Sequence, residues 1–166
     1  MVEVVVHTMV QDAAKQMVVV LKEREGPRAL PIVIGNYEAQ AILLELRGFE
    51  PARPLTHDLL RSVLDELGVQ LARVVVHDMR DNIYYAILVL VNNGTEQEVD
   101  ARPSDAIALA LRVGAPIYVG DKLMEEATVS LEDYEEPEAE QDPAKASEID
   151  RCFRDIISDL DLEDYS

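Results

Sequence analysis

The sequence is short of cysteine and of long apolar runs, and each shortage excludes a class of protein. Its 166 residues contain one cysteine, Cys152, which excludes an intrachain disulfide and a zinc site built from several cysteines. No apolar run reaches the roughly 18 residues of a membrane-spanning helix, and the first residues lack the pattern of a secretory signal. We therefore expect no membrane association and a reducing, cytoplasmic setting.

Basic residues are also scarce, with 15 Lys and Arg against 33 Asp and Glu and a net charge of −18. Residues 128–166 hold 14 of the acids and 3 of the bases, yet residues 1–127 still have a net charge of −7. A general electrostatic attraction for nucleic acid is excluded, because phosphate binding depends on basic contacts. A nucleic-acid role would need a local basic strip or bridging metal ions.

The patterns that are present predict a globular domain of strands and helices, and the apolar fraction of 48% agrees. Segments rich in valine and isoleucine predict strands, and apolar residues at helical spacing predict helices. We expect strands near residues 2–10, 16–23, 28–35, 70–79, 83–91, 96–101 and 116–120. We expect helices near residues 37–48, 56–68, 103–111 and 121–127. The second helix carries an apolar stripe formed by Leu59, Leu60, Val63, Leu64 and Leu67.

The composition changes at Thr128, where acids and two prolines replace the periodic pattern. We therefore expect a core over residues 1–127 and an acidic linker over residues 128–146. Apolar residues return at helical spacing between Ile149 and Leu160, which predicts an amphipathic C-terminal helix within residues 147–166. Such a helix has to pack on its own core or on a neighbouring subunit.

Three stretches at junctions between elements collect polar residues: "GNYEAQAI" (35–42), "RPLTHDLL" (53–60) and "DARPSDAIALALR" (100–112). Helix capping explains many of them. Asn36, Thr56 and Ser104 suit N-cap positions, and acids follow in each first turn, where the helix dipole favours them. Capping does not explain His57 beside an acid, nor Arg102 between two acids. A His–Asp pair suits a general base or a metal ligand, and an arginine suits phosphate.

These stretches, together with the strands around them, resemble the bifunctional nuclease family. The pieces that carry the resemblance are "LPIVIGNYEAQAI", "RPLTHDLL", "YYAILVL" and "DARPSDAIALALRVGAPIYV", in this order within residues 1–127. The resemblance implies an α/β domain of the α+β type, with a mixed, largely antiparallel sheet and three to four packed helices. It also implies assembly into homo-oligomers and hydrolysis of both DNA and RNA.

Carried over by motif, the resemblance implies a site that contains most of these polar residues. The catalytic candidates are His57, Asp58, Asp100, Arg102 and Asp105. Arg102, Ser104 and Arg53 are the candidates for substrate binding, and Glu38, Asp58, Asp100 and Asp105 are the candidates for holding Mg²⁺ or Mn²⁺. On this hypothesis His57 activates water and Arg102 neutralises phosphate. The alternative is a non-catalytic oligomeric binding module in which the same residues cap helices and bridge subunits.

Overall fold

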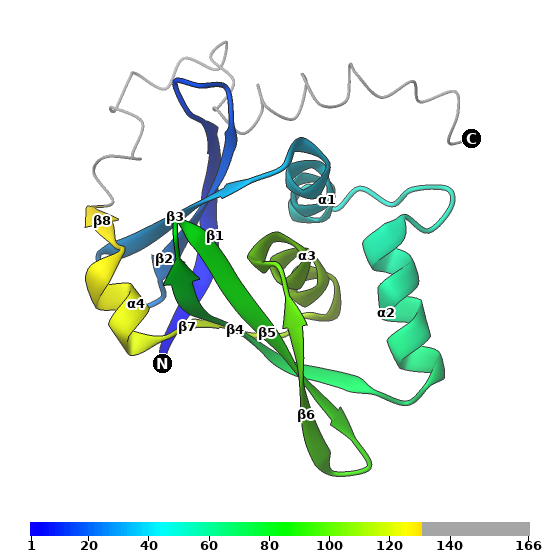
Figure 1. Ribbon diagram of the computed structural model, residues 1–166. Coiled ribbons are helices and arrows are strands. Elements are labelled where there is room, and N and C mark those ends of the chain that lie inside the picture. The colour runs from blue at the N-terminus through cyan, green and yellow to red at the C-terminus, as the bar shows by residue number, and fades with distance from the viewer. Residues whose placement is uncertain (131–166) are drawn as a thin grey trace.

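The computed structural model describes residues 1–130, and these residues form one twisted sheet with helices packed against it (Figure 1). The strands are β1 (Val2–Gln11), β2 (Met17–Glu23), β3 (Arg28–Ile34), β4 (Gln70–Arg80), β5 (Ile83–Asn92), β6 (Thr95–Ala101), β7 (Ile117–Val119) and β8 (Val129–Ser130). The helices are α1 (Asn36–Leu46), α2 (Thr56–Glu66), α3 (Pro103–Val113) and α4 (Asp121–Glu126). The strand order is β6-β5-β4-β7-β1-β2-β3-β8, and within residues 1–130 only β4 and β7 pair in parallel. The predicted mixed, largely antiparallel sheet is confirmed.

The main core lies between the sheet and helices α1 and α3. Ile42 and Leu43 of α1 and Ile107 and Leu109 of α3 are fully buried in it. Three buried alanines, at positions 106, 108 and 110, alternate with these two residues of α3, so this helix lies close to its neighbours, with α1 on one side and α2 on the other (Figure 1). This packing brings the first turns of three helices into contact.

The predicted N-caps of these helices are wrong by one or two residues. Gly35, Leu55 and Arg102 occupy the N-cap positions, and none of their side chains makes a capping hydrogen bond. Asn36, Thr56 and Ser104 therefore lie inside their helices. For α3 the reason is Pro103, which suits the first helical position and keeps the residue before it extended.

Helix α2 turns most of its apolar stripe away from the core. Four residues of the stripe are between 39% and 67% exposed: Leu59, Leu60, Val63 and Leu67. Leu64 is partly buried against the core, and His57 is the buried residue of this helix. A stripe of this kind ordinarily faces a core, so its exposure marks a surface that another apolar surface would cover.

The sheet continues beyond the predicted end of the core. Val129 and Ser130 form β8 and pair with Ala29 and Arg28 of β3, although the composition assigns them to the linker. Residues 131–166, which include the rest of the predicted linker and the predicted C-terminal helix, lie outside the described residues. Within residues 1–130, no helix has the length and apolar character to cross a membrane.

Candidate active site

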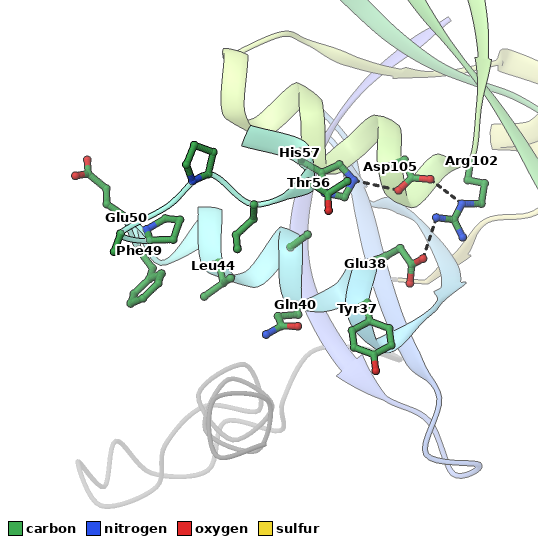
Figure 2. Close-up of a pocket in the computed structure, with 15 residues that line it drawn as sticks. Tyr37, Glu38, Gln40, Leu44, Phe49, Glu50, Thr56, His57, Arg102 and Asp105 are labelled. Atoms are coloured by element: carbon green, nitrogen blue, oxygen red, sulfur yellow. Dashed lines mark hydrogen bonds and ion pairs between the residues drawn. The ribbon is translucent and has the colours of Figure 1, made fainter. Parts of the chain in front are cut away.

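Four polar side chains from the starts of three helices form a continuous chain of contacts (Figure 2). His57 Nε2 lies 3.0 Å from Asp105 Oδ1, and Arg102 Nε donates to Asp105 Oδ2 at 2.6 Å. The same guanidinium group forms an ion pair with Glu38, with 2.9 Å between Nη2 and Oε1. We call Glu38, His57, Arg102 and Asp105 the polar cluster. Residues from all three sequence stretches thus meet at one place.

Local structure explains how Glu38 reaches this cluster. Gly35 ends the connection from β3 to α1, and a Cβ atom at this position would lie 2.2 Å from Glu38 Oε2. A side chain at residue 35 would therefore push the Glu38 carboxylate out of its place. Glycine leaves room for Glu38 to fold back from the first turn of α1 towards Arg102.

The electrostatics of the cluster keep Asp105 ionised. Burial by itself raises the pKa of Asp105, but hydrogen bonds from Arg102 and His57 outweigh it and hold that pKa below its ordinary value. The hydrogen bond to Asp105 likewise raises the pKa of Arg102. An ionised carboxylate against one imidazole nitrogen fixes the orientation of the ring, which is what a histidine acting as a general base requires.

The polar cluster lines one end of a groove of about 810 Å³, a volume in the range of ligand sites. The walls are α1 and the loop that leads from α1 to α2 (Figure 2). The other end of the groove is mainly apolar and is lined by Leu44, Phe49, Pro51, Pro54 and Leu55. Figure 2 shows Phe49 at the end of the groove remote from Arg102. The groove therefore combines a reactive polar end with an apolar binding surface.

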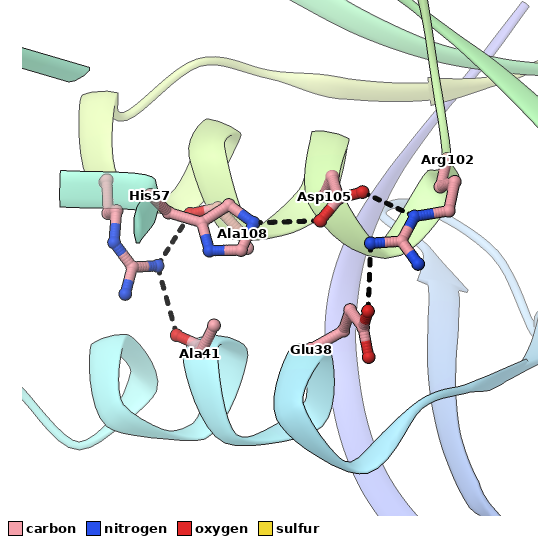
Figure 3. Close-up of polar contacts among 7 residues, drawn as sticks. Glu38, Ala41, His57, Arg102, Asp105 and Ala108 are labelled. Atoms are coloured by element: carbon pink, nitrogen blue, oxygen red, sulfur yellow. Dashed lines mark hydrogen bonds and ion pairs between the residues drawn. The ribbon is translucent and has the colours of Figure 1, made fainter. Parts of the chain in front are cut away.

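Asp58 does not join the cluster, because it forms a buried ion pair with Arg112. Arg112 Nε donates to Asp58 Oδ1 at 2.6 Å, and the Arg112 side chain is 2% exposed. Arg112 Nη1 also donates to the backbone carbonyls of Ala41 and Ala108, which Figure 3 shows. Burial raises the pKa of Asp58, but hydrogen bonds from Arg112 and the Leu55 amide outweigh it, so the pKa is lowered. This pair braces α1, α2 and α3 against one another.

Asp100 lies on the other face of the sheet. In β6 it pairs with Ile87, whereas the adjacent Ala101 pairs with Ala86 and packs against the main core. Successive side chains of a strand point to opposite faces, so Asp100 points away from the helices. It is exposed and is not among the residues that line the groove.

The two further candidates for substrate binding also lie outside this groove. Ser104 is buried and lines a second groove, of about 780 Å³, beside the β4–β5 turn. Arg53 is exposed in the loop before α2 and is not among the lining residues of the first groove. Arg102 lines both grooves and so lies between them.

Sequence reasoning missed three residues that matter to this site. Arg112 carries a signal, since it is a lone charge at the end of the apolar run "AIALAL" and such a charge needs a partner when it is buried. Gly35 and Phe49 carry weaker signals, because only the folded chain brings Gly35 against Glu38 and places Phe49 in the groove wall.

Comparison with known proteins identifies the family to which this chain belongs. An uncharacterised protein of Mycobacterium tuberculosis is 39% identical over 161 residues, which cover 97% of this chain and 95% of that protein. Bifunctional nuclease 1 of Oryza sativa subsp. indica is 30% identical over 117 residues, and bifunctional nuclease 1 of Arabidopsis thaliana is 30% identical over 116 residues. Each plant match covers 68% of this chain but only 35% and 36% of the plant proteins. The family model described as the bifunctional nuclease domain matches residues 19–132, well over half of the sequence, and the chain therefore belongs to the bifunctional nuclease domain family.

Proposed function

We propose that this chain hydrolyses phosphodiester bonds of DNA and RNA at the polar cluster. The observation that carries the proposal is the contiguous series His57–Asp105–Arg102 at the end of an open groove. It provides a candidate base, a carboxylate that orients it and a guanidinium group for phosphate. The family assignment and the names of the plant relatives favour a phosphodiester as the substrate over other esters.

In the proposed reaction His57 takes a proton from a water molecule, and the water oxygen attacks phosphorus. The bond from phosphorus to the leaving oxygen then breaks, that oxygen takes up a proton from solvent, and His57 releases its proton to solvent to complete the cycle. Asp105 stabilises the imidazolium form of His57. Arg102 uses two of its five N–H groups on Asp105 and Glu38, and the others are the donors for a phosphate oxygen. Glu38 is a positioning residue for Arg102.

The expected Mg²⁺ or Mn²⁺ site requires several ligands that converge. Within residues 1–130 no group of three or more His, Cys, Asp or Glu side chains has such an arrangement. Glu38 and Asp105 lie close to each other, but the guanidinium group of Arg102 is bound between them. The residues present do not fit a metal site, so we assign the neutralising charge to Arg102 and derive no step through a cation.

A chelation experiment tests both the activity and this assignment. We expect the full chain to cleave single-stranded DNA and RNA oligonucleotides in EDTA, because Arg102 supplies the positive charge. We expect added Mg²⁺ or Mn²⁺ to change the rate by less than about tenfold, which corresponds to about 1.4 kcal/mol. Product formation is followed on denaturing gels. Loss of cleavage in EDTA with recovery in Mn²⁺ would contradict the assignment to Arg102, and absence of cleavage in every condition would contradict the proposed function.

One observation favours the alternative of a non-catalytic binding module. Arg102 bridges two acids, Glu38 and Asp105, as a purely structural interpretation requires. Capping accounts for Asp58, whose Oδ2 accepts the Leu55 amide at 2.9 Å. It does not account for Asp105, whose described hydrogen bonds go to the side chains of His57 and Arg102 instead of to a backbone amide at the start of α3. This difference favours catalysis over capping.

We also propose that the chain forms homo-oligomers through the exposed stripe of α2, defined by Leu59, Leu60, Val63 and Leu67. The stripe is continuous along one helix, and two copies packed face to face would bury it by helix–helix contact. The predicted cytoplasmic setting stays a prediction.

Replacing Val63 by glutamate tests this interface. We expect Val63→Glu to reduce the mass of the full chain in sedimentation from an oligomer to a monomer, because a charge would be buried in an apolar contact. Ile83→Glu is the matched control, since Ile83 on β5 is 59% exposed and lies outside α2. A wild-type chain that is monomeric at all concentrations, or a Val63→Glu variant that keeps the wild-type mass, contradicts the proposal.

A further inference from the structure

We infer that the apolar end of the groove binds one unpaired nucleobase next to the polar cluster, so that the substrate is single-stranded DNA or RNA. The inference rests on the proposed function, because it assigns the substrate to the same groove. Three features of the described residues carry it: the lining of the groove, its size and the distribution of charge.

The lining of the apolar end suits the flat face of a base. Phe49 lines the groove and is 40% exposed, so part of its ring is open to a ligand. Pro51 and Pro54 belong to the same wall, and Leu44 closes the side formed by α1. Stacking of a base on an aromatic ring is tolerant of sequence, because every base offers a π-face. This lining therefore agrees with a nuclease that acts on both DNA and RNA.

The size of the groove selects an unpaired base. A volume of about 810 Å³ accommodates a nucleoside-sized ligand beside the polar cluster. In a duplex the faces of a base are covered by its stacked neighbours, so Phe49 reaches them only after the base has been extruded, which costs unpairing energy. Single strands avoid this cost, and they are the better substrate for this geometry.

The charge distribution requires that the base provides much of the affinity. Among the described residues that line the groove, Arg102 is the single lysine or arginine, and it already contacts two carboxylates. At least five of the other eight arginines within residues 1–130 are also paired with acids: Arg24 with Glu3, Arg28 with Glu23, Arg73 with Glu96, Arg80 with Asp78 and Arg112 with Asp58. A strand of nucleic acid therefore meets one cation at the site instead of a basic track. We expect few phosphate contacts and a weak dependence of binding on salt.

Binding of short oligonucleotides tests the inference. Fluorescence anisotropy with the full chain would compare five-nucleotide DNA and RNA single strands with a longer duplex, and cleavage would be followed on the same samples. We expect the single strands to bind at least about tenfold more tightly than the duplex. We expect Phe49→Ala to weaken single-strand binding about tenfold, in line with the loss of one stacked base, and Phe49→Tyr to restore it. The logarithm of affinity should fall with the logarithm of salt concentration with a slope of about −1, as for one or two phosphate contacts.

Tyr85→Ala is the matched aromatic control, because Tyr85 on β5 does not line the groove. Its ring lies under Arg80, whose Cζ is 5.1 Å from the ring centroid of Tyr85. Thermal unfolding of each variant shows whether it is folded. Equal binding by wild type and folded Phe49→Ala, or equal affinity for duplex and single strand, overturns the inference. Cleavage that is indifferent to Phe49 leaves the proposed function in place without the base site. Binding that depends on Phe49 in a chain that never cleaves keeps the base site and contradicts the proposed function.

Discussion

Replacing Asp105 by asparagine is expected to slow phosphodiester cleavage by about 10²- to 10⁴-fold, the range that general acid–base catalysis contributes. The amide keeps the size of the side chain and can still accept the hydrogen bond from Arg102 Nε. It has no negative charge to stabilise protonated His57. Rates on a single-stranded oligonucleotide, corrected for the folded fraction by thermal unfolding, would measure the effect.

Asp78→Asn is the matched control for this experiment. Like Asp105, Asp78 is paired at 2.6 Å with an arginine, here Arg80, but it lies on β4 outside the groove. We expect this variant to cleave at the wild-type rate. An Asp105→Asn protein that cleaves as fast as wild type per folded molecule would return Asp105 to a purely structural role.

Replacing Asp58 by alanine is expected to destabilise the fold by about 3–5 kcal/mol, the cost of leaving one member of a buried ion pair alone. Arg112 would keep its charge while its side chain is 2% exposed, with only two backbone carbonyls as partners. Urea unfolding of Asp58→Ala, Arg112→Met and the double variant gives the coupling energy. We expect the double variant to be more stable than Asp58→Ala, because it no longer buries an unpaired charge.

Glu96→Gln is the corresponding control at an exposed pair. Glu96 binds Arg73 through two hydrogen bonds of 3.0 Å on the sheet surface, and exposed pairs contribute about 1 kcal/mol or less. If Asp58→Ala lowered the free energy of unfolding by no more than Glu96→Gln does, the buried pair would not be what holds the three helices together.

The ion pair between Asp58 and Arg112 makes the stability of the fold depend on pH. The pKa of Asp58 is lower in the folded chain than in the unfolded chain, where an aspartate titrates near 3.9. The ion pair therefore contributes fully to the free energy of unfolding above the pKa that Asp58 has in the unfolded chain. This contribution is lost as pH falls through the pKa that Asp58 has in the folded chain. Wild type should lose stability more steeply than Asp58→Ala in this acidic range, and urea unfolding at several pH values would measure the difference. If the free energies of unfolding of wild type and Asp58→Ala fell in parallel with pH, this prediction would be wrong.

Several features of the site could be predicted from particular residues, and others needed the folded chain. Alternation and turn residues predicted the strands, and the polar junctions predicted where side chains of the site gather. Helix geometry could have separated His57 from Asp58, because adjacent residues on a helix point about 100° apart. Strand alternation likewise separates Asp100 from its neighbour Ala101.

The contacts that join distant parts of the chain were beyond sequence reasoning. Arg112 is 54 residues from Asp58, and Asp105 is 48 residues from His57. No local pattern specifies that Arg112 meets Asp58 or that Asp105 meets His57, because the packing of α2 on α3 decides both contacts. The exposure of the α2 stripe has the same origin, since periodicity identifies an apolar face but not the surface that covers it.

The two carboxylates that hold Arg102 also govern what happens when a phosphate group leaves. A guanidinium group without other partners would retain any small anion that reached it. Here Glu38 and Asp105 already offset the positive charge of Arg102, so a phosphate oxygen bound to the remaining N–H groups is held weakly. Inorganic phosphate and sulfate should accordingly be poor inhibitors, and turnover should depend little on the anion content of the solution.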